Sequence, residues 1–253
     1  MPAQSGYEVY NEHSRVIFLH GYPGQSSDFT HIAKPLDYLC DLYDMPWLDP
    51  LVGKLSLDMV VAAIAEEIKN DYVHVVGHDL GAVVGYYLGH KYPQFVKSLT
   101  MIATPPLDVY QDNLLVLKAG GYFDYMRTLA NHDPQLPLPS LEQFAHLEKT
   151  DPKIKTYLSN NKRLTNPFAI LSMYNSMWQG IPPLSSKKMA FPMLFIHGED
   201  DPYFPKKLLI PLIDDENVNC RYHSIAKAGH WVHLTHPNEC SGAIQDFFKD
   251  TDG

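Results

Sequence analysis

Residues 72–85 read Tyr-Val-His-Val-Val-Gly-His-Asp-Leu-Gly-Ala-Val-Val-Gly and place an acid, Asp79, two residues from a glycine on either side. The β-branched run Tyr72–Val76 predicts a strand, and the apolar pattern of Leu80–Lys91 predicts a helix. Glycine permits the sharp backbone turn that such a connection needs. The stretch therefore predicts a strand, a tight turn and a helix, with a carboxylate exposed at the turn.

This arrangement is that of the Gly-x-Ser-x-Gly nucleophile elbow, in which the turn exposes the middle side chain. Here the middle residue is Asp79 instead of serine. A serine must lose a proton before it attacks and suits acyl carbonyls, whereas a carboxylate is anionic at neutral pH and can displace a leaving group at an sp3 carbon. Asp79 therefore favours epoxide opening or halide removal over serine-type ester hydrolysis.

Composition limits the class of protein. The chain has 253 residues, 45% of them hydrophobic, which suffices for one α/β domain or for one domain with an insertion. A formal net charge of −9 and the lack of a Lys- or Arg-rich stripe argue against nucleic-acid binding. The longest apolar stretches have the length of strands, so we expect no membrane partner.

The N-terminal residues and the cysteines bear on the cellular compartment. Met1–Arg15 is polar and lacks the apolar segment of a secretory signal. Cys40, Cys220 and Cys240 form an odd set without C-x-x-C spacing, which is typical of free thiols in a reducing compartment. We therefore expect a cytoplasmic protein.

Strands and helices alternate through the first hundred residues. A strand at Arg15–Leu19, a helix at Ser56–Asn70, the strand and helix around Asp79, and a strand at Val96–Ala103 follow one another. Ser56 can cap the first of these helices. Such alternation predicts an α/β fold with a parallel sheet, and ligands bind such a sheet at the carboxyl ends of its strands.

The alternation stops at Thr104-Pro105-Pro106, after which only helical patterns are found, at Asn113–Ala130, Leu141–Thr150, Pro152–Ser159 and Asn166–Trp178. It then resumes with Met193–Ile196, a helix after Pro205, a strand near Cys220–Ser224 and a helix from Asn238 to about Lys249. We interpret residues 1–104 and 184–253 as one core domain and residues 105–183 as an inserted helical lid. An independent helical domain is the alternative.

Two later segments supply the acid and the base that an Asp nucleophile would need. Gly198-Glu199-Asp200-Asp201-Pro202 follows a predicted strand, and a carboxylate there can orient a histidine, although a solvated acidic turn is the alternative. Both Asp200 and Asp201 qualify. His230, in Ala228-Gly229-His230-Trp231, precedes the final helix, which completes the order nucleophile, acid, histidine.

The loop His20-Gly21-Tyr22-Pro23 follows the first strand. It can aim the backbone N–H of Tyr22 at the site, beside that of Leu80, and the two donors would form an oxyanion hole. For His78, inside the elbow, we expect the backbone to matter more than the ring. His233 and His236 are expected at the surface or behind the site.

These motifs together resemble the α/β-hydrolase superfamily, in particular its branch of epoxide hydrolases and haloalkane and haloacid dehalogenases. The resemblance rests on Gly-His-Asp-x-Gly, the upstream His-Gly-x-Pro loop and the downstream Gly-His-Trp, and it covers nearly the whole chain. It implies a mostly parallel eight-stranded sheet with a helical cap, and no cofactor or metal. It also implies Asp79 as nucleophile, Asp201 in preference to Asp200 as acid, and His230 as base.

The lid bears on the choice between subfamilies. Epoxide hydrolases resemble one another in using two cap tyrosines, and a phenol with a pKa near ~10 stays protonated at neutral pH and can donate to the epoxide oxygen. Tyr125, in Tyr122-Phe123-Asp124-Tyr125, and Tyr174, in Ser172-Met173-Tyr174-Asn175, occupy similar contexts. The alternative for each is packing of an amphipathic helix.

Leu80 weakens the dehalogenase alternatives. Haloalkane dehalogenases typically have Trp directly after the nucleophile to hold the halide, and fluoroacetate-type enzymes have Arg there; many epoxide hydrolases also have Trp, so Leu80 is atypical for them too. Trp47, Trp178 and Trp231 remain possible indole donors. We expect His20, Trp47 and Trp178 to contact the substrate.

The sequence therefore predicts a hydrolase that converts a small apolar epoxide to a vicinal diol through an ester on Asp79, which water activated by His230 then hydrolyses. A haloalkane or haloacid dehalogenase with the same nucleophile is the first alternative. A non-catalytic binding protein that keeps the fold is the second. Substrate identity and oligomeric state stay open.

Overall fold

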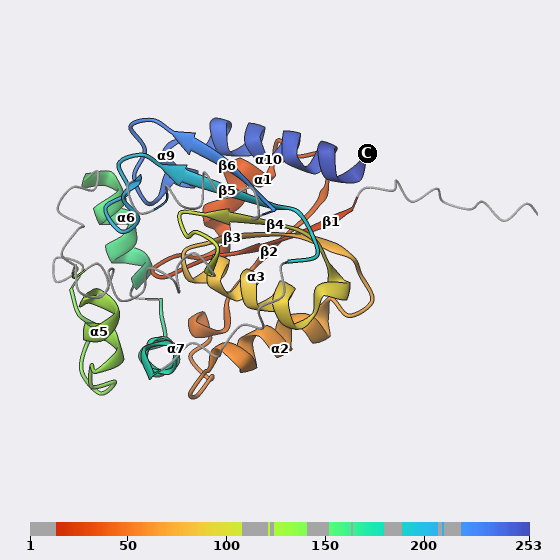
Figure 1. Ribbon diagram of the computed structural model, residues 1–253. Helices are drawn as coiled ribbons and strands as arrows, with labels where there is room; N and C mark the ends of the chain where they lie inside the picture. Colours follow the sequence, from red (N-terminus) through yellow and green to blue (C-terminus); the bar gives the residue numbers. More distant parts are fainter. Residues whose placement is uncertain are drawn as a thin grey trace, which may run out of the picture.

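The computed structural model describes residues 14–107, 121, 124–140, 152–162, 164–179, 189–206, 209 and 219–253. They contain a six-stranded parallel sheet in the order β2-β1-β3-β4-β5-β6 (Figure 1). The strands are β1 (Arg15–Leu19), β2 (Leu39–Tyr43), β3 (Val73–His78), β4 (Val96–Ile102), β5 (Met193–Gly198) and β6 (Cys220–Ile225). The predicted parallel α/β architecture is confirmed.

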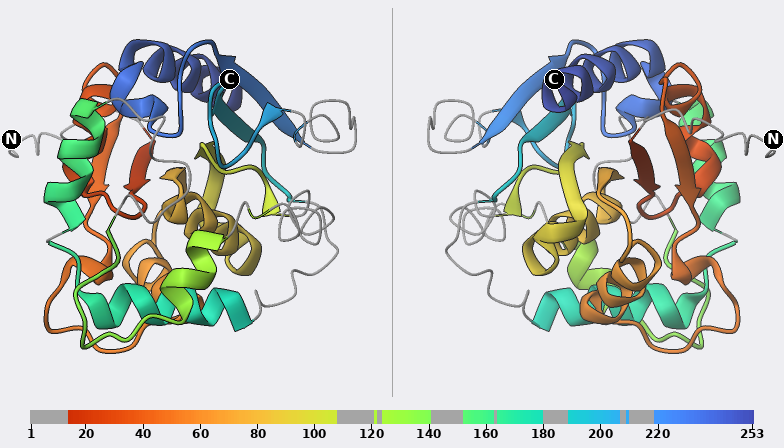
Figure 2. Two further views of the ribbon diagram at one scale, coloured as in Figure 1. Left: turned by 90° about the vertical axis from the view of Figure 1, so that its left-hand side faces the viewer. Right: turned by 90° about the vertical axis from the view of Figure 1, so that its right-hand side faces the viewer.

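Helices cover both faces of the sheet (Figures 1 and 2). On one face lie α2 (Leu57–Glu67) and α3 (Leu80–Lys91), and on the other lie α1 (Thr30–Ala33) and α10 (Pro237–Asp252). Successive strand residues point to opposite faces, so Val75 joins the core under α2 and α3, whereas Val76 joins the core under α1 and α10. Burial on both faces explains the continuous apolar runs of these strands.

Three of the predicted core helices, at Ser56–Asn70, Leu80–Lys91 and Asn238 to about Lys249, agree with α2, α3 and α10 within a few residues. The Ser56 hydroxyl caps α2 by accepting a hydrogen bond from the Met59 N–H at 3.3 Å. Short 3-10 helices lie at η1 (Ser26–Phe29), η2 (Pro46–Leu48) and η3 (Pro93–Phe95), and α9 (Val232–Thr235) precedes α10. No helix among the described residues is both long enough and apolar enough to cross a membrane.

The helices α5 (Asp124–Ala130), α6 (Pro152–Lys162) and α7 (Pro167–Gln179) lie beyond the end of the sheet to which the strands point (Figures 1 and 2). The helices α6 and α7 correspond to the helices predicted at Pro152–Ser159 and Asn166–Trp178, and α5 to the last part of the one predicted at Asn113–Ala130, of which residues 113–120, 122 and 123 lie outside the described residues. The fourth predicted lid helix, Leu141–Thr150, and most of the helix predicted after Pro205 lie outside the described residues. The lid boundary at residues 183 and 184 also lies outside them, so the domain limits stay a prediction.

The edges of the sheet differ from the expectation taken from the resemblance. Eight strands were expected, and the described residues contain six, with β2 and β6 at the edges. The pattern analysis did not predict β2, because Asp41 interrupts its apolar residues; this carboxylate accepts a hydrogen bond from Arg15 on β1 at 2.5 Å. The three cysteines are unpaired, as predicted.

Candidate active site

The turn between β3 and α3 holds Asp79 in an unusual backbone conformation, with φ of 51° and ψ of −121°. A positive φ is strained for any residue other than glycine. The turn brings the first residues of α3 against the loop after β1. A Cβ on Gly81 would lie 1.9 Å from the Leu19 carbonyl oxygen, so only glycine fits there.

Hydrogen bonds hold the strained residue from both sides. The Asp79 N–H donates to the carbonyl of Ile102 at the end of β4, at 3.2 Å. The Asp79 carbonyl accepts from the Ala82 N–H at 3.0 Å and from the Thr104 hydroxyl at 3.3 Å. The surrounding backbone thus fixes the position from which the carboxylate points, as strained functional residues require.

Two backbone donors reach the Asp79 carboxylate. The Tyr22 N–H donates to Asp79 Oδ1 at 3.1 Å, and the Leu80 N–H also hydrogen bonds the carboxylate. The loop that carries Tyr22 passes so close that a Cβ on Gly21 would lie 2.6 Å from Asp79 Oδ1. Two backbone donors directed at one carboxylate are the groups that form an oxyanion hole.

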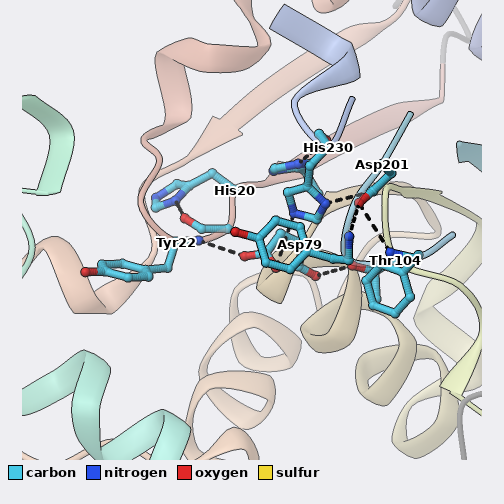
Figure 3. A network of polar contacts seen from close by, with 10 residues as sticks. His20, Tyr22, Asp79, Thr104, Asp201 and His230 are labelled. Carbon is cyan, nitrogen blue, oxygen red and sulfur yellow. Dashed lines mark hydrogen bonds and ion pairs between the residues drawn. The ribbon is translucent and has the colours of Figure 1, made fainter. Parts of the chain in front are cut away.

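His230 and Asp201 lie on the other side of the same carboxylate (Figure 3). His230 Nδ1 donates to Asp201 Oδ2 at 2.9 Å, and His230 Nε2 is 3.7 Å from Asp79 Oδ2. The second oxygen of Asp201 accepts from the N–H groups of Tyr203 and Phe204, at 2.8 and 3.3 Å. Asp200 is exposed, so of the two candidate acids it is Asp201 that contacts the histidine.

The charges of these three groups support one another. Burial alone would lower the pKa of His230, but the negative charges of Asp201 and Asp79 outweigh it and raise the pKa to about 10. Burial alone would raise the pKa of Asp79, but the hydrogen bonding and charge of His230 outweigh it and lower the pKa. At neutral pH the site therefore holds an anionic Asp79 beside a protonated His230.

The two predicted tyrosines face this carboxylate from the lid. Tyr125 lies on α5 and Tyr174 on α7, with ring centroids 6.2 Å apart, and both line the cavities above Asp79. Burial, and then the nearby charge of Asp79, raise the pKa of Tyr174 well above 10. The Tyr174 phenol therefore stays protonated throughout the physiological pH range.

The helix that carries Tyr174 is fastened to the core domain. The Asn166 side chain caps α7 by accepting from the Phe168 N–H at 3.1 Å, and its amide donates to the carbonyls of Asp49 and Val52 at 2.8 Å each. One turn further along, the Ser172 hydroxyl accepts from the Leu55 N–H at 2.7 Å. Tyr174 is thus held over Asp79 by a loop of the core.

Two cavities meet at Asp79, Tyr125 and Tyr174. The first is also lined by ring-bearing residues, namely Tyr22, Pro23, Tyr203, His230 and Trp231. The second is also lined mainly by aliphatic and thioether side chains, namely Leu80, Val83, Thr104, Leu107, Met126, Met177 and Phe204. Trp231, one of the three possible indole donors, is therefore the one that borders a cavity.

The three residues predicted to contact substrate, His20, Trp47 and Trp178, line neither cavity. His20 instead fastens the loop: its Nδ1 donates to the Gly21 carbonyl at 2.9 Å, and its Nε2 accepts from the Met45 N–H at 3.0 Å. Burial lowers the pKa of His20 to about 4, so the ring stays neutral. Trp47 is fully buried against the His20 ring.

The ring of His78 has a role that the pattern did not predict. Its Nε2 donates to the backbone carbonyl of His230 at 3.1 Å, which ties the nucleophile turn to the loop of the base. His233 is buried behind the site, one of the two places expected for it, and its ring lies 4.1 Å from that of His78. The sequence signal for this contact is the position of His78 next to the predicted nucleophile and of His233 near the predicted base.

Tyr203 is the main cavity residue that the motifs did not identify. Its ring lies 4.8 Å from that of His230 and 5.3 Å from that of Tyr125, and it borders the first cavity. A phenol two residues after the predicted acid was the available signal. Because its N–H also binds Asp201, Tyr203 contacts the acid, the base and one lid tyrosine.

Comparison with known proteins agrees with this arrangement of the chain. A model of the alpha/beta hydrolase fold matches residues 14–237, from just before β1 to the first residue of α10. Epoxide hydrolase 3 of Mus musculus is 24% identical over 93% of this chain and 70% of that protein. Esterase YbfF of Escherichia coli is also 24% identical, over 98% of each chain.

A solved structure has a similar fold. A variant of a Bacillus megaterium epoxide hydrolase, complexed with its product (R)-3-[1]naphthyloxy-propane-1,2-diol, has a TM-score of 0.75, 21% sequence identity and 94% coverage of both chains. The family match spans the six described strands together with Asp79, Asp201 and His230. This chain therefore belongs to the α/β-hydrolase fold family.

Proposed function

We propose that this α/β-hydrolase is an epoxide hydrolase that works through an ester on Asp79. One observation carries the proposal: an anionic carboxylate at the elbow faces two lid tyrosines, with the His230–Asp201 pair within 3.7 Å of it. A carboxylate nucleophile suits an sp3 carbon, and a phenol suits the alkoxide that leaves it. These are the two partners that epoxide opening needs.

In the first step, an Asp79 oxygen attacks an epoxide carbon and forms a carbon–oxygen ester bond. The ring carbon–oxygen bond breaks, and its electron pair goes to the epoxide oxygen. Tyr125 and Tyr174 stabilise this oxygen and supply its proton, because both phenols border the cavity over Asp79. The Tyr22 N–H binds Asp79 Oδ1, and we assign the attack to Oδ2.

The ester removes the negative charge of Asp79, which lowers the pKa of His230, and the ring releases its proton to solvent. In the second step, the neutral His230 ring removes a proton from a water molecule that attacks the carboxyl carbon of Asp79. Asp201 orients the His230 ring and stabilises its protonated form. Negative charge then develops on the oxygen that the Tyr22 and Leu80 N–H groups face. The bond between the carboxyl carbon and the alkyl oxygen then breaks, and the proton held by His230 goes to the departing alkoxide. The second proton of the attacking water restores the tyrosine phenol as Asp79 returns to a carboxylate. The diol leaves with a second hydroxyl oxygen that comes from Asp79, and the water oxygen stays in the carboxylate.

The comparisons support this proposal in part. A structural neighbour of similar fold binds a vicinal diol, and one curated relative is an epoxide hydrolase, whereas another is an esterase. A serine-type esterase mechanism has no hydroxyl at position 79. Trp231 borders the cavity and favours a dehalogenase as the second candidate, since an indole N–H can bind a halide.

Replacement of the base tests the mechanism. His230→Gln incubated with 1,2-epoxyhexane or styrene oxide should accumulate an enzyme heavier by one substrate, with the added mass on the peptide that contains Asp79. The matched control is His236→Gln, six residues further along, which should turn over normally. Absence of an adduct with turnover intact would contradict the proposal, and halide release from haloalkanes without diol formation would favour the dehalogenase.

A further inference from the structure

The two cavities at the site differ in chemistry and share the reacting group. Asp79, Tyr125 and Tyr174 border both, so an epoxide held between the carboxylate and the phenols lies at their junction. We call the remainder of the first cavity the ring-lined lobe (Tyr22, Pro23, Tyr203, His230, Trp231) and that of the second the aliphatic lobe (Leu80, Val83, Thr104, Leu107, Met126, Met177, Phe204). Substituents on the two epoxide carbons must extend into these lobes.

The ring-lined lobe has to admit water. His230 borders only this lobe, and its Nε2 lies 3.7 Å from Asp79 Oδ2. Water activated by His230 would therefore reach the Asp79 carboxyl carbon from this side. A bulky substituent held in this lobe would take the place of that water, so the epoxide carbon on this side should carry only hydrogen.

The aliphatic lobe offers a hydrocarbon environment. Apart from the shared residues it has no charged side chain, and its one hydroxyl, that of Thr104, already donates to the Asp79 carbonyl at 3.3 Å. Leu107, Met126 and Met177 are buried, and unbranched methionine side chains adapt to flexible chains. Phe204 is its one aromatic ring beyond the shared tyrosines.

We infer that the preferred substrates are terminal epoxides with a single unbranched alkyl chain. The chain occupies the aliphatic lobe, and the unsubstituted carbon faces the ring-lined lobe and its water. This inference rests on the proposed function and deepens it, because it divides the site into one lobe for the chain and one for the hydrolytic water.

A series of substrates tests this division. From 1,2-epoxybutane upward, kcat/KM should rise about fourfold for each methylene, the factor that burial of one methylene corresponds to, until the lobe is full. The isomers 2,3-epoxyhexane and 3,4-epoxyhexane should react at least about tenfold more slowly than 1,2-epoxyhexane, because a second alkyl group enters the ring-lined lobe. Styrene oxide should also fall below 1,2-epoxyhexane.

Variants at Met177 test the assignment of this residue to the aliphatic lobe. Met177→Phe should shift the best substrate to a shorter chain, and Met177→Ala should shift it to a longer one, so that one informative variant remains if the other fails to fold. Met59→Phe is the matched control, because Met59 is 56% exposed on α2 and borders neither cavity. The control should leave the chain-length profile unchanged.

Two results would overturn the inference, and they separate it from the proposed function. Equal rates for terminal and internal epoxides, or a chain-length profile that neither Met177 variant moves, would refute the division into lobes. If His230→Gln still formed the ester on Asp79 in that case, the epoxide hydrolase proposal would stand. If no epoxide alkylated Asp79, both would fall.

Discussion

The elbow and the lid tyrosines face each other across one cavity, yet the chain holds them by different means. Asp79 is fixed by backbone: a positive φ, a carbonyl held by Thr104 and the N–H groups of Tyr22 and Leu80. Tyr174 is fixed by side chains, since α7 is fastened through Asn166 and Ser172 to the loop at 49–55.

From this difference we infer which parts of the site tolerate substitution. The backbone of the elbow has no spare volume, because a Cβ on Gly81 would overlap the Leu19 carbonyl. The lid contributes single hydroxyls from Tyr125 and Tyr174, and their removal leaves the apolar packing of α5 and α7 in place. Substitutions at the elbow should therefore damage the fold, and substitutions at the lid should reduce rates while the fold survives.

The largest expected effect comes from the elbow. Gly81→Ala should lower the free energy of unfolding by about 4 kcal/mol or more, since a Cβ 1.9 Å from a backbone oxygen forces the turn apart. Urea unfolding measures this change. The matched control is Gly53→Ala, where a Cβ meets no atom within 4 Å, and a comparable loss in that variant would contradict the account.

The lid tyrosines come next. Tyr125→Phe and Tyr174→Phe should each reduce kcat for an epoxide by about 100-fold, the range of a single general acid, and the double variant should lose more than either. Unfolding curves of the single variants should stay close to that of the parent protein. Equal activity of parent and double variant would show that the phenols do not serve the reaction.

The next prediction concerns the pKa of His230, which depends on the charge of Asp79 at the elbow. In the free protein the charges of Asp201 and Asp79 raise this pKa to about 10, and the ester on Asp79 removes one of the two charges. Asp79→Asn mimics that loss and should lower the His230 pKa in an NMR titration. For the same reason kcat should rise with pH, through a pKa below that of the free enzyme, when ester hydrolysis limits the rate. An unchanged His230 pKa in Asp79→Asn would refute the coupling.

The smallest effect is expected where the lid is fastened. Ser172→Ala leaves the Leu55 N–H without its partner and should cost about 1–2 kcal/mol of unfolding free energy. Because α7 carries Tyr174, activity should fall with it. Ser176→Ala, on the same helix and with the same change in helix propensity, is the matched control and should leave both quantities nearly unchanged.

The elbow could be predicted from the sequence, because the residues that form it lie within a few positions of one another. Gly77, Asp79 and Gly81 have a spacing that the turn itself requires, and the order of Asp79, Asp201 and His230 follows the fold. The acid was ambiguous between Asp200 and Asp201, because only the folded loop shows which carboxylate points inward. Strand β2 was missed, because a charged residue, Asp41, interrupts its half-buried apolar residues.

The surroundings of the site were less predictable, because they depend on packing between distant segments. His20 and Trp47 looked like cavity residues from their place in the loops, but their rings turn inward and support the loop. Tyr203 and the ring of His78 reach the base through contacts that no motif spacing encodes. The roles of Tyr125 and Tyr174 were predicted from resemblance to a family and not from helical periodicity.

The central claim is that the Asp79 carboxylate forms a covalent ester, and a single turnover in oxygen-18 water tests it most directly. With enzyme in excess over 1,2-epoxyhexane, the account predicts a diol without oxygen-18 and one oxygen-18 atom in the peptide that contains Asp79. The label enters the carboxylate because water attacks the Asp79 carboxyl carbon. Oxygen-18 in the first diol, with none in that peptide, would mean that water opens the epoxide directly and would contradict the account.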